Sequence, residues 1–201
     1  MKSRILQIVV LLSILAGGCG GPKTKNIDIV HDDGKAVMAL DYRDFDQAAS
    51  AMVQSMVGSG ALKKKGGGRY VVATGRIVND TMQRIDTDQL MAKIEEELLN
   101  SGQVVMTSAV GSGADKLIHE TRELRDSEEF DQDTVAKRGT LIAPELSISG
   151  KIFQRNLRYD SKRQQVEYYF QLKLSDATSG LRYWQKETLI GKRGSNKSVA
   201  W

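Results

Sequence analysis

The chain has 201 residues, with 29 Lys and Arg against 25 Asp and Glu, two His and a single Cys. One cysteine excludes an intramolecular disulfide, and two histidines argue against a His-based metal site. The net charge of +4 is weak evidence for a nucleic-acid partner, which requires Lys and Arg clustered on one face, so we expect none.

The N-terminal segment, residues 1–18, has the order of a secretory signal. Lys2 and Arg4 precede an apolar run from Ile5 to Ala16, and small residues then lead to Cys19. The apolar run is roughly twelve residues, too short for a hydrocarbon core that needs about twenty, so we expect no permanent span. Small residues directly before a cysteine resemble the lipobox of bacterial lipoproteins.

The lipobox resemblance implies an address for the protein. It implies cleavage before Cys19 and acylation there by fatty acids such as palmitate, and several chains together give lasting membrane attachment. Gly20 stands where Asp would signal inner-membrane retention in the enterobacterial type, so the resemblance implies the periplasmic side of the outer membrane. We expect residues 19–36 to be a flexible tether and residues 37–201 a single globular domain. The alternative is an ordinary signal peptide with an incidental cysteine.

Residues 41–60 carry apolar side chains at the three-four spacing of a helix. We expect Asp44 to be its N-cap and Gly58 to end it. The apolar stripe is rich in Met, which indicates a core face. Its members are Phe45, Ala48, Ala49, Met52, Val53 and Met56.

The next segment is typical of a strand, a helix and a strand. Residues 69–79 form a nearly continuous β-favouring run, as expected for a strand covered on both faces. The spacing over 81–102 predicts a helix capped by Asp86 or Thr87, and 103–108 predict a short second strand. This order predicts a βαβ unit, whose two strands are parallel.

Two more helices are predicted over 113–133 and 133–145. Three strands are then predicted over 145–159, 164–176 and 181–191. Apolar and polar residues alternate along the middle strand, which indicates one buried face. The predicted fold class is α/β: a mixed sheet of about five strands, with a βαβ start and an antiparallel end, flanked by helices.

The sequence offers no complete catalytic motif. "HETRE" at 119–123 lacks the second histidine of the zinc-protease pattern, and "GKRGSNKS" at 191–198 lacks the last glycine of a phosphate loop. No acid, base, nucleophile and oxyanion donor converge in any arrangement of the predicted elements. We therefore expect a binding protein with no catalytic residue, cofactor or metal.

Three stretches resemble one family, the LpoB activators of penicillin-binding proteins. "LDYRDFDQAASAMVQSMV" is similar to the family's opening Asp-aromatic pair and its helix with a Met-Val pair. "APELSISGKI" resembles its next strand, keeping Gly150 and Ile152. "YYFQLKLSDATSGLRYW" resembles its closing hairpin, with Gly180 in the turn and Trp184 beyond it. Such hairpins also occur in curli-secretion-like and TolB-N-terminal-like domains.

The resemblance implies an outer-membrane lipoprotein that binds and activates a bifunctional class A penicillin-binding protein, a peptidoglycan synthase, and so regulates cell-wall synthesis and cell shape. We expect a monomer with no enzymatic activity. Exposed aromatic and Arg side chains commonly dominate interface energy. The candidate partner-binding residues are Tyr42, Arg69, Arg158, Tyr169, Arg182 and Trp184.

Two other functional classes stay open. A curli-type secretion or assembly lipoprotein that oligomerises in the outer membrane would need lipid-facing strands of alternating apolar residues. The closing strands and their turn instead carry many charges, among them Lys151, Arg155 and Lys162. An envelope enzyme or small-molecule binder would have a concave pocket with several convergent polar groups.

Overall fold

The computed structural model describes residues 27–29, 37–195 and 197. The chain divides into two compact units, residues 1–34 and 35–201, and the helices and strands discussed here all belong to the second. The predicted signal, the lipidation site at Cys19 and most of the predicted tether lie outside the described residues.

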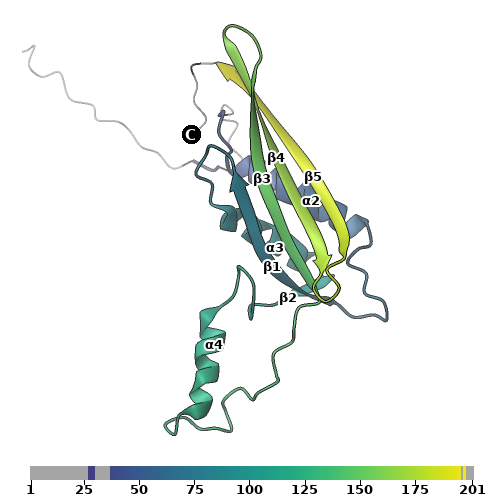
Figure 1. The fold of residues 1–201 in the computed structure, drawn as a ribbon, viewed down its shortest axis with the longest axis vertical. Coiled ribbons are helices and arrows are strands. Elements are labelled where there is room, and N and C mark those ends of the chain that lie inside the picture. The colour runs from purple at the N-terminus through teal and green to yellow at the C-terminus, as the bar shows by residue number, and fades with distance from the viewer. Residues whose placement is uncertain (1–26, 30–36, 196, 198–201) are drawn as a thin grey trace, which may run out of the picture. The chain divides into compact units, whose positions relative to one another are not determined.

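A five-stranded mixed sheet forms the body of this unit, in the order β2-β1-β3-β4-β5 (Figure 1). Strand β1 pairs in parallel with β2 and with β3, whereas β3, β4 and β5 are antiparallel neighbours. The predicted fold class, with its parallel start and antiparallel end, is confirmed. The strands are β1 Tyr70–Asp80, β2 Val104–Met106, β3 Leu146–Arg158, β4 Arg163–Asp176 and β5 Arg182–Ser195.

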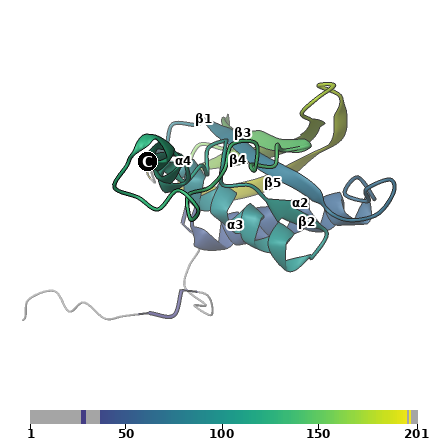
Figure 2. The same cartoon turned by 90° about the horizontal axis from the view of Figure 1, so that it is seen from below.

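Two helices, α2 Tyr42–Gly58 and α3 Thr87–Asn100, lie side by side on one face of this sheet (Figure 2). The expectation that β1 is covered on both faces is wrong for its second half, where Val78 is 55% exposed. A bulge between Thr74 and Ile77 shifts the register of β1 against β3. The bulge changes which positions of β1 face the helices. Apolar residues therefore occur at both odd and even positions of β1, although only one face of the strand is covered along its second half.

The hydrophobic core fills the space between these helices and the sheet. The predicted Met-rich stripe of α2 is confirmed as core, with Met52 1% and Met56 0% exposed. Opposite it lies Tyr168 of β4, whose hydroxyl accepts a hydrogen bond from Gln83 and donates one to the Met38 carbonyl. Burial raises the pKa of Tyr168 to about 12, so the hydroxyl stays a donor.

Helix α2 begins one turn earlier than predicted, because its N-cap is Asp41 and not Asp44. The Asp41 carboxylate accepts from the backbone of Arg43 and Asp44, and the Asp44 carboxylate accepts from the Asp41 backbone N–H at 2.8 Å. This reciprocal pair is a capping box. Burial opposes ionisation of Asp41, but the hydrogen bond from Arg43 and the nearby charge of Lys192 bring its pKa below the ordinary value.

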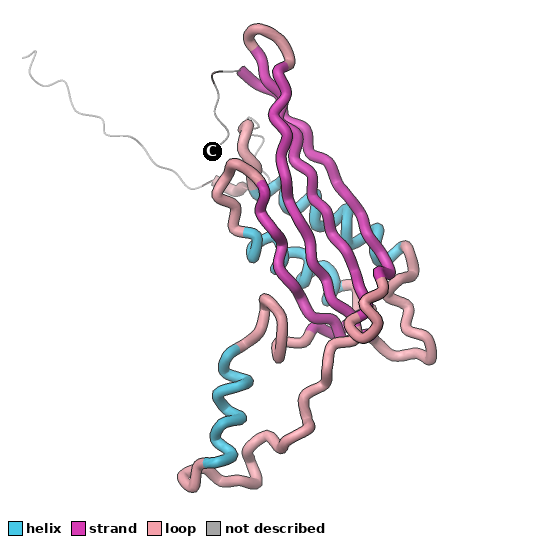
Figure 3. The backbone as a smooth tube through the Cα atoms, in the orientation of Figure 1, coloured by secondary structure: helices cyan, strands magenta, loops and turns pink. Residues whose placement is uncertain are grey.

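The segment between β2 and β3 differs most from the prediction. Its helix α4, Lys116–Glu123, runs into a short 3-10 turn, η2 Leu124–Asp126, and none of their residues is buried. The helix predicted over 133–145 is wrong, because that stretch has no helical turn. Arg122 and Arg125 donate to backbone carbonyls of residues 136 and 137, which are acceptors that a helix would use. Figure 3 shows this long connection as loop on both sides of α4. Within the described part of the chain, no helix is both long and apolar enough to cross a membrane.

Candidate functional site

The sheet has one face that no described helix covers. Along β3, β4 and β5, even-numbered residues such as Ile148, Phe170 and Ile190 point to the helices and are buried. Odd-numbered residues therefore lie on the opposite side. At the start of β5 a register shift pairs Arg182 with Ser175, so Arg182 also lies on that side. We call this side the open face. It presents three antiparallel strands of 13, 14 and 14 residues, the longest regular surface in the described chain.

Stacked aromatic rings stand on the open face. Phe153 of β3 is the cross-strand neighbour of Tyr169 of β4, and their rings stack with centroids 4.7 Å apart. The Arg155 guanidinium lies 5.3 Å from the Tyr169 ring centroid, and the Lys151 ammonium 5.7 Å from that of Phe153. Cations at these distances are attracted by the ring faces. We call these four residues the aromatic ladder.

Hydrogen bonds fix the polar end of the ladder. The Glu167 carboxylate accepts from the Tyr169 hydroxyl and from the Gln165 amide, both at 2.7 Å. The Tyr169 bond lowers the pKa of Glu167, with help from Gln165, and the same bond raises the pKa of Tyr169. Arg193 of β5 donates to the Gln165 amide oxygen at 2.7 Å. The side chain of Tyr169 is thus held in place before any partner arrives.

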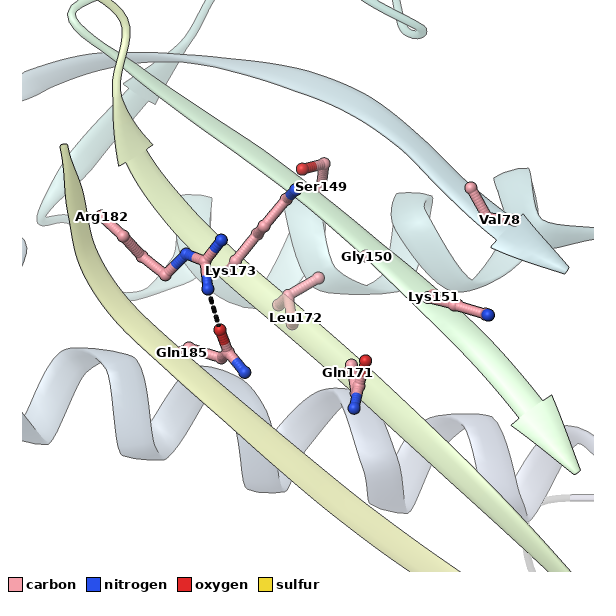
Figure 4. A pocket seen from close by; sticks show the side chains of 9 residues that line it. All are labelled: Val78, Ser149, Gly150, Lys151, Gln171, Leu172, Lys173, Arg182 and Gln185. Atoms are coloured by element: carbon pink, nitrogen blue, oxygen red, sulfur yellow. Dashed lines mark hydrogen bonds between the residues drawn. The ribbon is translucent and has the colours of Figure 1, made fainter. Parts of the chain in front are cut away.

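A hollow of about 360 Å³ opens beside the ladder on the same face (Figure 4). We call it the basic hollow, because its lining includes Lys151, Lys173 and Arg182 but no acidic residue. One guanidinium nitrogen of Arg182 donates to the Gln185 side-chain oxygen at 2.5 Å. The lining residues are Val78, Ser149, Gly150, Lys151, Gln171, Leu172, Lys173, Arg182 and Gln185.

Small residues leave this hollow open. Where Phe153 carries a ring further along β3, position 149 on the same face carries only the Ser hydroxymethyl group. A Cβ atom at Gly150 would overlap the backbone carbonyl of Gln171, so the strand pairing itself requires glycine there. On the other side of β3, a Cβ at Gly75 would lie 3.2 Å from the Ser149 Cβ. Close strand approach therefore fixes the shape of the floor.

Only part of the sequence-based candidate set lies on the open face. Tyr169 belongs to the aromatic ladder, and Arg182 lines the basic hollow. Trp184 is 9% exposed and packs within the helix-facing core, so the structure gives it a packing role. The signal that separates Tyr169 from Trp184 is the odd-even alternation of the strands.

The other three candidates lie apart from one another. Tyr42 is the first residue of α2 and is half-buried. Arg69 is exposed and immediately precedes β1, and Arg158 is the exposed last residue of β3. The sequence reasoning missed Lys151, Phe153, Arg155 and Lys173, although all four occupy odd positions of the predicted strands.

No group of metal-binding side chains accompanies this face among the described residues. Among residues 27–29, 37–195 and 197, no three His, Cys, Asp or Glu side chains group where they could hold a metal ion. His119, the histidine of "HETRE", has its Nε2 2.7 Å from the Ala109 carbonyl oxygen, which ties α4 to the loop before it.

Comparison with known proteins gives one family and several solved structures. The model of the family described as peptidoglycan-synthase activator LpoB matches residues 44–190. The LpoB C-terminal domain from Escherichia coli is 14% identical, with a TM-score of 0.43 over 73% of this chain and 98% of that one. The corresponding domain from Salmonella enterica is 12% identical, with a TM-score of 0.42 over the same shares. Lipoprotein GNA1162 from Neisseria meningitidis is 15% identical, with a TM-score of 0.35 over 65% and 85%. No curated protein matches the chain.

Proposed function

Because this chain belongs to the peptidoglycan-synthase activator LpoB family, we propose that it binds and activates a bifunctional class A penicillin-binding protein. The observation that carries this proposal is the extent of the family match. It takes in most of α2, the whole of α3 and all five strands, the last of them as far as Ile190. The protein would therefore act through binding and have no catalytic step of its own.

We propose that residues 1–18 are a lipoprotein signal and that Cys19 carries the lipid anchor, on the periplasmic side of the outer membrane. The lipobox-like order of residues before Cys19 supports this address. Residues 19–36 would then be the tether, and residues 37–201 the domain that meets the partner. The compact unit of residues 35–201 supports a domain boundary near residue 37.

The aromatic ladder is the proposed centre of the docking surface. Tyr and Arg are over-represented among the residues that dominate interface energy, and the ladder holds one of each beside Phe153. Its hydrogen bonds reduce the entropy that its side chains would lose on docking. Arg158 and Arg182, near the ends of the strands that carry the ladder, are proposed as outer contacts of the same surface. Tyr42 and Arg69 stay candidates for a separate contact.

Activation places a thermodynamic requirement on the docking. The protein must bind the active conformation of the synthase more tightly than the inactive one, because equal affinity for both leaves their ratio unchanged. A tenfold shift toward the active conformation needs about 1.4 kcal/mol of differential binding energy. One well-placed interface residue contributes that much.

The test is a binding and glycan-strand polymerisation assay with purified class A synthases. Arg155→Ala and Tyr169→Ala should each weaken binding about thirtyfold, the effect of losing a residue that contributes about 2 kcal/mol. Arg84→Ala is the matched control, because Arg84 is exposed in the loop before α3. Failure of the unaltered protein to bind or stimulate any class A synthase contradicts the proposed function. Normal binding by both ladder variants contradicts the docking surface alone.

A further inference from the structure

We propose that the basic hollow binds a carboxylate-bearing fragment of peptidoglycan, a disaccharide with its peptide stem. This inference rests on the proposed function for the polymer involved, and it assigns to the protein a ligand in addition to the synthase. The observations behind it are the unpaired cations, the mixed polar lining and the size of the hollow.

Two cations of the hollow have no acidic partner. Lys151 forms an ion pair with Asp80 at 2.5 Å, which points its ammonium away from the hollow (Figure 4). Neither Lys173 nor Arg182 forms an ion pair with any described residue, and Arg182 is held only by the amide oxygen of Gln185. Arg presents a rigid fork that accepts a carboxylate bidentately, and Lys adds a point charge. A carboxylate between them would satisfy both.

The strand register brings the polar lining into one row. Ser149, Lys173 and Gln185 are direct cross-strand neighbours on β3, β4 and β5. Each has a hydroxyl, ammonium or amide group that can donate a hydrogen bond. Gln171, one step along the open face, donates to Glu187 at 2.7 Å. The carboxylate of Glu187 repels a second anion, which restricts the ligand's acidic group to the Lys173 and Arg182 end.

The size and lining favour a sugar–peptide over a lone acidic side chain of a protein. A volume of about 360 Å³ lies within the range of small-molecule sites, roughly 300–1,000 Å³. Amide and hydroxyl groups beside the cations match a ligand that has amides and hydroxyls beside its carboxylates. The hollow shares Lys151 with the aromatic ladder, and along β4 its lining residue Gln171 is two positions, about 7 Å, from Tyr169. The fragment would therefore be held next to the docked synthase.

In the experiment, the full chain in mild detergent is titrated with a soluble disaccharide–peptide fragment of peptidoglycan, and calorimetry measures the binding affinity. We expect saturable binding that Lys173→Gln and Arg182→Gln each weaken at least tenfold. Lys162→Gln, an exposed Lys in the β3–β4 turn, is the control and should leave the affinity unchanged. The same fragment with its carboxylates amidated should not bind.

Two further probes separate the sources of the anion. Inorganic phosphate that displaces the fragment at equal concentration, or a Glu-rich peptide that binds more tightly than the fragment, overturns the assignment to peptidoglycan. No binding of the fragment overturns it as well. Since no synthase is present in these titrations, their outcome is independent of the activation assay, and Lys173→Gln should still stimulate the synthase.

Discussion

Lys192 of β5 connects the sheet to the N-terminus of α2 through two ion pairs. Its side chain is 8% exposed, and its ammonium lies 2.5 Å from the Asp44 carboxylate and 3.9 Å from that of Asp41. These are the two residues of the capping box, so one lysine of β5 fixes the start of α2. A charge this enclosed is tolerated because carboxylates face it. Removal of either partner leaves the other as an uncompensated buried charge, which destabilises the fold.

Replacement of this lysine tests that dependence. Lys192→Met keeps the apolar stem but removes the charge, and should lower the free energy of unfolding by about 3 kcal/mol, because an enclosed carboxylate loses its partner. Chemical denaturation measures the change. Lys162→Met in the exposed β3–β4 turn is the control and should change little. Equal stabilities for the two variants would contradict this role of Lys192, because water would then stabilise the charge of Asp44 as well as the lysine does.

At the scale of elements, Gly150 marks a point of close approach between β3 and β4. A Cβ atom added at Gly150 would overlap the backbone carbonyl of Gln171. A backbone carbonyl cannot move aside as the end of a flexible side chain can. Ala normally suits a strand better than Gly by about 0.5–1 kcal/mol. The contact with Gln171 reverses that preference, so the sheet and the floor of the hollow depend on the same glycine.

A pair of glycine replacements tests this reversal. Gly150→Ala should destabilise the fold by about 2 kcal/mol, within the range for overpacking a close contact. Gly191→Ala is matched to it, because Gly191 lies on the neighbouring strand β5 with no atom within 4 Å of its virtual Cβ, and should be neutral or stabilising. Thermal unfolding of both variants measures the difference. A more stable Gly150→Ala protein would contradict the role given to Gln171.

The order and type of the main elements could be predicted from the sequence, because α2, α3 and β4 each have a clear periodicity. Helix starts were less certain: Asp41 and Asp44 are both good caps, and only the reciprocal bonds distinguish them. The helix predicted over 133–145 is wrong: Arg122 of α4 and Arg125 of η2 bind carbonyls of this stretch, which is a tertiary effect that a local sequence pattern does not show.

The candidate site was predictable only in part. Tyr169 follows from residue type and from its odd position on a strand, but the stacking of Phe153 on Tyr169 depends on the register between β3 and β4. The place of Arg182 depends on the register shift that pairs it with Ser175. The hollow depends on the close approach at Gly150. Neither register nor strand separation can be read from a single sequence pattern.

At the scale of the whole molecule, the proposed binding surface and the core are separated by the thickness of one sheet. Both packed helices lie on one face, and the opposite face carries the ladder and the hollow. Variants on the open face therefore change recognition while leaving the helix-facing core intact. The proposed anchor adds a third part, which confines the domain to within tether length of a membrane.

The anchor is tested by replacing its cysteine. Cys19→Ser should abolish acylation, so the protein should move from the outer-membrane fraction to the soluble envelope fraction, because the buried acyl chains supply the attachment. Fractionation with mass spectrometry of the mature N-terminus measures both effects. Ser3→Ala, a polar change within the predicted signal, is the control. An unmodified thiol on membrane-bound protein would contradict the proposed anchor.

The contacts of Met38 determine which strands would bear a force applied to the chain on its N-terminal side. The carbonyl of Met38 accepts a hydrogen bond from Tyr168 of β4, the Met38 side chain lies against Gly194 of β5, and the Leu40 N–H donates to Gln83. Tension on the preceding chain would therefore load β4 and β5 before it reached the first turn of α2. We expect these contacts to keep the N-terminal end of α2 from being pulled off the sheet. The open face would then keep its structure under tension on the proposed tether.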